Sequence, residues 1–187
     1  PEAAYMERAD VELIEAQTKY TQGEFEEALI KCEDALAQST DIEVSSLICV
    51  LESEIYTEQE EYTKAADSAI RVTKFDSSKD ARRRAGSLAF EAGNHLEDTK
   101  EKNGWYEKAR KYYETLCQDE TCSYEDEMNY ALVLQALEQY SDSNVCLRKM
   151  REEYPDDYKV LMWMCYNYLG IGNQKGSMAE VESDLNF

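Results

Sequence analysis

Few side chains in this 187-residue sequence have the chemistry that catalysis requires. His95 is the one histidine, and a lone histidine on a helical pattern is typical of a surface or core residue rather than a general base. No glycine-rich phosphate loop, nucleophile elbow or His-Glu-x-x-His element occurs. The sequence therefore predicts a protein that is not an enzyme, with no catalytic residues and no cofactor.

Six cysteines are present, but their spacing does not predict a metal site. Cys117 and Cys122 have no second pair and no nearby histidine to complete a zinc site. The acidic runs at 58–61 and 125–127 lack the alternation and central glycine of a calcium loop. The other four cysteines lie in apolar helical patterns, which favours a reducing, cytoplasmic compartment. Cys117 and Cys122 are compatible with a small disulfide loop and equally with two free thiols.

The basic run at residues 79–84 is a candidate anion-binding site. It is expected in the first turns of a helix, where cations oppose the helix dipole. Acidic residues of neighbouring helices would offset this electrostatic destabilisation. A bound peptide rich in carboxylates or phosphates would do the same, and so would the acidic end of another copy of the chain. Arginine pairs bidentately with carboxylate and phosphate groups, so the candidate peptide-binding residues are Arg82, Arg83 and Arg84. Trp163 is a further candidate, because it is offset from the apolar stripe of its helix and is expected to face a groove or a partner.

The net charge of the chain limits the classes of molecule that it is expected to bind. The formal net charge is −20, which excludes a nucleic-acid binder and disfavours anionic lipid. No run approaches 18 apolar residues, so no membrane span is predicted. Residues 1–70 carry 4 basic and 18 acidic side chains, residues 71–111 carry 11 and 7, and residues 112–187 carry 5 and 15. A basic band between two acidic ends is compatible with a protein partner, including an acidic peptide.

The elements that would position these residues are predicted to be helices. Gly and Pro together number 9, which disfavours turn-rich β folds, and the chain is rich in the helix formers Glu, Ala and Leu. Apolar residues recur at spacings of three and four, as in the stripe Leu47, Leu51 and Ile55. We therefore expect an all-α protein.

Four segments of the chain read alike. Each has an aromatic residue, follows a helical stretch and opens another helix, with a small residue three positions after the aromatic. The aromatics are Phe25, Tyr62, Tyr106 and Tyr140, separated by 37, 44 and 34 residues. A weaker fifth segment reopens near Lys175. Helical segments repeating at this spacing indicate an array of stacked helical hairpins.

This pattern resembles the tetratricopeptide repeat (TPR) family, whose unit is a 34-residue helix–turn–helix. The segment that matches best has Tyr130, Ala131, Leu134, Tyr140, Ser143, Leu147, Met150 and Pro155 at the family's positions. The resemblance implies a right-handed α-solenoid of about five TPR-like hairpins. It covers residues 1–187 as a single domain, which we expect to be the C-terminal part of a longer protein.

Two segments depart from or end the pattern. The third repeat is about ten residues longer than the family's unit, and the excess lies in residues 98–103. That stretch is polar and ends in Asn103-Gly104, a turn signal, so it is expected to be an extended helix end or a projecting loop. Met178, Val181 and Leu185 fall on one face of a last segment, which predicts a capping helix.

The resemblance implies a function in protein–protein interaction, as a scaffold or regulatory module. In the family, first helices line the concave groove where a peptide or helix binds. Residues 13–17 lack the lysine and asparagine of repeat proteins that clamp a chaperone's C-terminal carboxylate, so that subclass is rejected. Two alternatives stay open: an acidic secretion chaperone, and a sensor or regulatory tail of an upstream catalytic domain.

Overall fold

A computed structural model describes residues 8–118 and 122–175. Nine α-helices and no strand occur in these ranges, which confirms the predicted all-α class. The helices are α1 (Arg8–Thr21), α2 (Phe25–Gln38), α3 (Ile42–Glu58), α4 (Tyr62–Val72), α5 (Lys79–Asn94), α6 (Thr99–Cys117), α7 (Tyr124–Ala136), α8 (Tyr140–Glu153) and α9 (Tyr158–Lys175). The predicted capping segment with Met178, Val181 and Leu185 lies outside the described residues.

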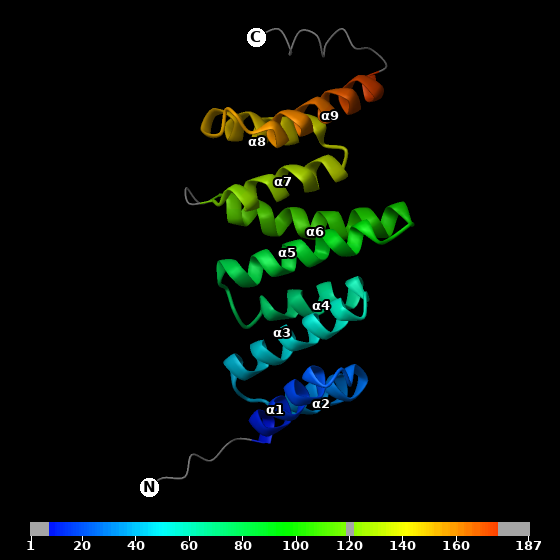
Figure 1. Cartoon of the computed structure of the whole chain (residues 1–187), viewed down its shortest axis with the longest axis vertical. Helices are drawn as coiled ribbons and strands as arrows, with labels where there is room; N and C mark the ends of the chain where they lie inside the picture. Colours follow the sequence, from blue (N-terminus) through cyan, green and yellow to red (C-terminus); the bar gives the residue numbers. More distant parts are fainter. Residues whose placement is uncertain (1–7, 119–121, 176–187) are drawn as a thin grey trace. The chain divides into compact units, whose positions relative to one another are not determined.

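The chain divides into two compact units, Pro1–Lys102 and Asn103–Phe187, here called the N-terminal and C-terminal units. In the N-terminal unit, α1 pairs with α2 and α3 pairs with α4, while α5 packs on α4 (Figure 1). Further contacts join α2 and α1 to α3. In the C-terminal unit, α7 pairs with α8, and α9 packs on α8. The helices thus pack as the pairs α1–α2, α3–α4 and α7–α8, with α5 and α9 each packed on the second helix of a pair.

Three of the hairpins have the same type of turn between their two helices. The residue that reverses the chain has a positive φ in each case: Gly23 at 77°, Glu60 at 59° and Glu138 at 59°. Two residues later, the predicted aromatics Phe25, Tyr62 and Tyr140 are the first residues of α2, α4 and α8. Glycine adopts this left-handed conformation most readily, so Gly23 suits its turn better than the two glutamates suit theirs.

The fourth aromatic, Tyr106, does not open a helix, and the turn predicted at Asn103-Gly104 is wrong. Both residues lie inside α6, which begins at Thr99. The carboxylate of Asp98 accepts a hydrogen bond from the backbone N–H of Glu101 at 2.9 Å and so starts the helix two turns early. The extra length of the third repeat is therefore an extended helix end, the first of the two predicted forms.

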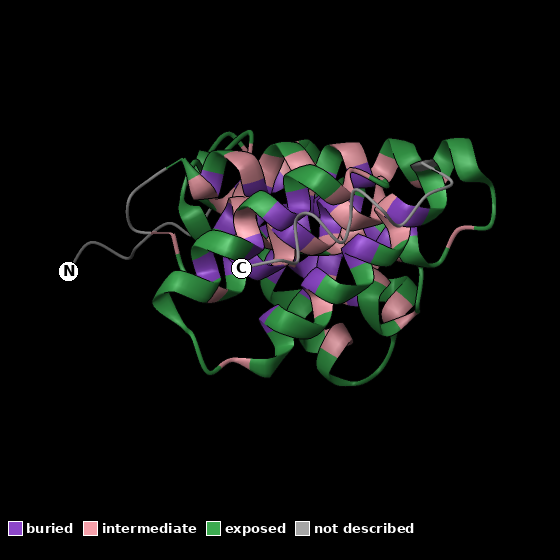
Figure 2. Cartoon of the chain, turned by 90° about the horizontal axis from the view of Figure 1, so that it is seen from above, coloured by how far each residue is buried: buried purple, intermediate pink, exposed green. Residues whose placement is uncertain are grey.

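The cores of both units are built largely from aliphatic and small residues. In the N-terminal unit the central cluster is Leu13, Ala16, Ala28, Cys32, Ala35, Ile48, Leu51 and Ile55. Leu47, predicted in this stripe, is 50% exposed, and Ile48 is buried at this turn of α3 instead. In the C-terminal unit the cluster is Met128, Ala131, Leu147, Met150, Val160, Met164 and Tyr168. Buried residues gather on the inner faces of the helices (Figure 2).

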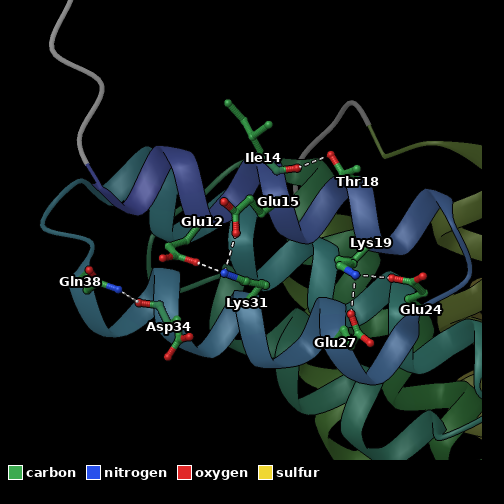
Figure 3. Close-up of polar contacts among 10 residues, drawn as sticks. All are labelled: Glu12, Ile14, Glu15, Thr18, Lys19, Glu24, Glu27, Lys31, Asp34 and Gln38. Atoms are coloured by element: carbon green, nitrogen blue, oxygen red, sulfur yellow. Dashed lines mark hydrogen bonds and ion pairs between the residues drawn. The ribbon is translucent and has the colours of Figure 1, made fainter.

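Two lysines link the helices of the first hairpin, and each of them is bonded to two glutamates (Figure 3). Lys31 of α2 bonds to Glu12 at 2.8 Å and to Glu15 at 2.5 Å, both on α1. These hydrogen bonds raise the pKa of Lys31. In the same way Lys19 of α1 pairs with two glutamates at the start of α2. Two of the four basic residues in segment 1–70 are thus paired with glutamates within this hairpin. With 18 acidic side chains, the segment as a whole stays negatively charged.

Candidate protein-interaction surface

The three candidate arginines lie in the first turns of α5, as predicted. Ser78 caps this helix, because its hydroxyl accepts a hydrogen bond from the backbone N–H of Ala81 at 3.2 Å. Arg82, Arg83 and Arg84 are all half-buried. Successive residues of an α-helix are about 100° apart around the axis, so the three guanidinium groups leave the helix in different directions.

Two of the arginines have acidic partners within the N-terminal unit. Arg84 donates a hydrogen bond to Glu54 of α3 at 3.1 Å, and Arg83 donates one to Asp80 at 2.6 Å. In the described part of the chain, Arg82 forms no ion pair. The offset by acidic neighbouring helices that the sequence suggested is therefore present for Arg84, and in local form for Arg83.

A hollow of about 280 Å³ opens beside Arg84. Its lining comes from α1, α3 and α5, the first helices of three successive repeats: Tyr20, Glu54, Thr57, Glu58, Arg84, Ser87 and Leu88. Burial raises the pKa of Tyr20, and the nearby carboxylates of Glu58 and Glu54 raise it further. The phenol therefore stays protonated at neutral pH and can donate a hydrogen bond. With two carboxylates and one guanidinium, the hollow can bind polar and charged groups of either sign.

A second hollow, of about 640 Å³, lies between the start of α3 and the loop from α4 to α5. Three exposed apolar side chains line it: Ile42, Leu47 and Phe75. Asp41 and Asp76 stand at its edge, each held by backbone N–H groups, with Asp41 accepting from Glu43 at 2.7 Å and Asp76 from Ser78 at 2.8 Å. Its lining thus combines apolar contact area with fixed negative charge.

A third hollow, of about 500 Å³, lies along α2, α3 and α4 and contains a polar cluster that was not predicted from the sequence. Glu52 is only 3% exposed, and its carboxylate pairs with Arg71. Ser68 links the two, donating to Glu52 at 3.4 Å and accepting from Arg71 at 3.2 Å. The burial of Glu52 could have been predicted from its position, because it lies on the same helix face as the apolar residues Ile48 and Ile55.

Trp163, the remaining candidate, belongs to α9 in the C-terminal unit. It is half-buried at the edge of the core, and its ring meets Tyr166 edge-on with 6.0 Å between centroids. The other face of α9 carries exposed apolar side chains: Tyr158, Leu161, Met162, Tyr166 and Leu169. Of the apolar stripe predicted on this helix, Leu161, Met164, Cys165 and Tyr168, the structure buries Met164 and Tyr168, whereas Leu161 and Cys165 are exposed and Val160 is buried instead.

His95 contacts an aromatic ring and a carboxylate of its own unit. Its ring stacks on Tyr62 with 4.0 Å between centroids, and its Nε2 lies 2.9 Å from the carboxylate of Glu91. Across the described ranges, no three acidic, histidine or cysteine side chains converge as a metal site. Likewise, no helix described by the structure is long and apolar enough to cross a bilayer.

Comparison with solved structures identifies the fold. A tetratricopeptide repeat protein from Parabacteroides merdae ATCC 43184 is 20% identical over 97% of this chain, with a TM-score of 0.58. This chain spans 66% of that protein, slightly less than two thirds of its length. MamA of AMB-1 is 10% identical, with a TM-score of 0.61, and the match covers 94% of this chain and 88% of that one. The likeness in both cases extends over nearly all of this sequence.

A thermophilic TPR protein from Thermus thermophilus is also similar, at 14% identity and a TM-score of 0.51, covering 88% of this chain and 83% of its own. No protein-family model and no curated protein matches the sequence. The structural likenesses nevertheless agree with one another. The chain has a TPR-like fold, a helical solenoid, as the repeats in its sequence predicted.

Proposed function

We propose that this protein is a protein–protein interaction module that binds a peptide or helix on the face formed by its first helices. The observation that carries this proposal is the hollow lined by α1, α3 and α5. One surface reached from three successive repeats fits an extended ligand, since each repeat supplies side chains to it. The TPR-like fold supports an interaction scaffold in general terms.

The proposed ligand is an acidic peptide, and Arg84 is the residue best placed to bind it. Arg84 lines the hollow, and Arg83 lies next to it on the helix. In the free protein Glu54 pairs with Arg84, so a ligand carboxylate or phosphate would compete with Glu54 for the guanidinium. Acidic residues further away than the Debye length, about 8 Å at physiological salt, are largely screened, so the net charge of −20 does not by itself prevent this contact. Glu54 and Glu58 line the same hollow and would oppose an acidic ligand locally. Trp163 is a second proposed contact, within the C-terminal unit.

The test compares two neutral substitutions two residues apart on one helix. A library of acidic and phosphorylated peptides is screened on the wild type, and the tightest ligand is titrated against the Arg84→Gln and Arg82→Gln variants. We expect Arg84→Gln to weaken binding about tenfold or more, equivalent to about 1.4 kcal/mol. Arg82→Gln removes an arginine of the same helix that does not line the hollow and forms no ion pair in the described part of the chain, and it should change binding less than about twofold.

Glu54→Gln separates ligand binding from internal pairing. This variant removes the partner of Arg84 but keeps the guanidinium, so acidic-peptide binding should strengthen or stay equal. Binding should also weaken as salt rises. Equal losses in both arginine variants would overturn the special role of Arg84 and assign binding to the basic run as a whole. A fall in melting temperature with unchanged binding would exclude Arg84 as the contact. Selective binding of basic peptides would retain the interaction module and overturn its acidic ligand.

A further inference from the structure

Two thiols meet at the corner between α6 and α7. Cys117 is the last residue of α6, and Cys122 directly precedes Ser123, the N-cap of α7. Their Sγ atoms are 2.7 Å apart, and both residues are free, half-buried cysteines of the C-terminal unit. The ends of two helices hold the thiols, so the short distance does not depend on long flexible side chains.

The other described cysteines differ in surroundings. Cys32 and Cys49 are fully buried, and Cys165 is exposed on α9. Only Cys117 and Cys122, among the cysteines, are joined by a thiol–thiol contact in the part of the chain that the structure describes. A disulfide has an S–S distance of about 2.05 Å, so the two sulfur atoms lie within an ångström of bonding distance.

We propose that Cys117 and Cys122 form an oxidisable dithiol, which closes to an intramolecular disulfide by exchange with a small disulfide such as oxidised glutathione. The bridge joins the C-terminal end of α6 to the start of α7. It would stabilise this corner by limiting the unfolded ensemble.

The surroundings assign the order of attack. Burial raises the pKa of both thiols, but the hydrogen bond between them lowers the pKa of Cys122 and raises that of Cys117. Glu127 and Asp126 raise both values, while Lys149 lowers that of Cys122. We assign the first attack to Cys122, since the thiolate is the nucleophile in disulfide exchange and the nearby cation of Lys149 favours the ionised form of this thiol.

The exchange proceeds in two balanced steps. The Cys122 thiolate attacks one sulfur of oxidised glutathione, forming a mixed disulfide and releasing one glutathione thiolate. The Cys117 thiolate then attacks Cys122 Sγ, forming the internal disulfide and releasing the second glutathione. The two protons lost by the cysteines go to the two leaving thiolates. The protein is oxidised by two electrons and one glutathione disulfide is reduced to two thiols.

The experiment incubates the native 187-residue chain with oxidised glutathione, then counts thiols after denaturation and maps the peptides by mass spectrometry. We expect six titratable thiols before oxidation and four after it, with Cys117 linked to Cys122. The melting temperature should rise by roughly 4–8 °C and return to its initial value when dithiothreitol is added.

Two variants serve as controls. Cys117→Ser should stop at the mixed disulfide on Cys122, because the resolving thiol is missing. Cys165→Ser removes the exposed thiol and should leave formation of the bridge unchanged. A wild type that keeps all six thiols, or that forms only mixed or intermolecular disulfides, would overturn the proposal. The wild-type peptide map decides the question even where a variant fails to fold.

Discussion

The two units place polar groups inside their helix interfaces in different ways. The N-terminal unit buries a charge: the carboxylate of Glu52 pairs with Arg71 across α3 and α4. The C-terminal unit also buries a carboxylate, that of Glu127, which pairs with the exposed Lys149 of α8, and in addition it buries a network of neutral groups around Asn167 of α9. The Asn167 side-chain amide donates to Ser143 at 2.8 Å and to Asn144 at 2.9 Å, and its oxygen accepts from Gln135 at 2.7 Å.

Access to solvent explains the difference. The side chain of Arg71 is 39% exposed and opens into a hollow, so mainly the carboxylate of the pair loses its hydration. Asn167 and Ser143 are fully buried, where a charge would lose most of its hydration. Neutral amides and hydroxyls cost less to bury when they are hydrogen-bonded to one another. An ion pair therefore suits an interface next to solvent, and an amide network suits a closed one.

The largest expected effect follows from removing the exposed half of the ion pair. Arg71→Met leaves the Glu52 carboxylate buried without its cation, and we expect a loss of about 3 kcal/mol in the free energy of unfolding. Chemical denaturation measures this loss. Adding Glu52→Gln to the variant should recover part of it, because the buried charge is then gone.

Lys64→Met is the matched control for this variant. Lys64 lies on the same helix as Arg71 and pairs with the exposed Glu61, so its removal should cost less than about 1 kcal/mol. Equal losses for Arg71→Met and Lys64→Met would contradict the contrast between a buried and a surface pair.

A smaller loss is expected from the amide network. Asn167→Ala removes three hydrogen bonds and leaves Ser143, Asn144 and Gln135 without this partner, which should cost about 2 kcal/mol. The exposed Asn173 on the same helix provides the control, and its replacement by Ala should stay within about 0.5 kcal/mol. Denaturant titration of both variants decides the point; an unchanged Asn167→Ala midpoint would mean that the network adds no stability.

The features that sequence predicts well here are those set by local periodicity. Phe25, Tyr62 and Tyr140 were expected to open helices, and each is the first residue of one. Tyr106 was misplaced because Asn103-Gly104 read as a turn, whereas the cap at Asp98 starts the helix earlier. A dipeptide's turn preference is weak beside a capped helix with a packed face.

Contacts between particular pairs of residues were harder to predict from the sequence. Position 143 was expected to be small, and Ser143 is fully buried, but its hydrogen bonds to Ala131 and Asn167 depend on which helix lies opposite. The arginines of α5 were correctly placed on a helix start, yet the pairing of Arg84 with Glu54 joins residues 30 apart in sequence. Periodicity identifies the face of a helix, whereas tertiary packing selects the partner.

The smallest expected effect concerns a polar contact at the edge of the C-terminal core and depends on pH. Tyr124 of α7 donates a hydrogen bond to the carboxylate of Asp157, which lowers the pKa of Asp157. A carboxyl group whose pKa is lower in the folded state stabilises the fold above its unfolded pKa of about 3.9, and this contribution is lost as pH falls through the folded value. Burial and this bond raise the pKa of Tyr124 to about 12, so its own ionisation lies far from this range.

Tyr124→Phe removes the bond but keeps the ring, including most of its edge-on packing against Tyr154 at 5.1 Å between centroids. At pH 7 we expect the melting temperature to fall by no more than about 2 °C, because the contact is partly exposed to solvent. The difference from wild type should shrink below about pH 4 and vanish once Asp157 is protonated in both proteins. Tyr154→Phe, which keeps the bond to Asp157, should show no such pH dependence. A Tyr124→Phe deficit that stays constant from pH 7 to pH 3 would assign the effect to ring packing rather than to the carboxylate, since only the hydrogen bond is linked to the protonation of Asp157.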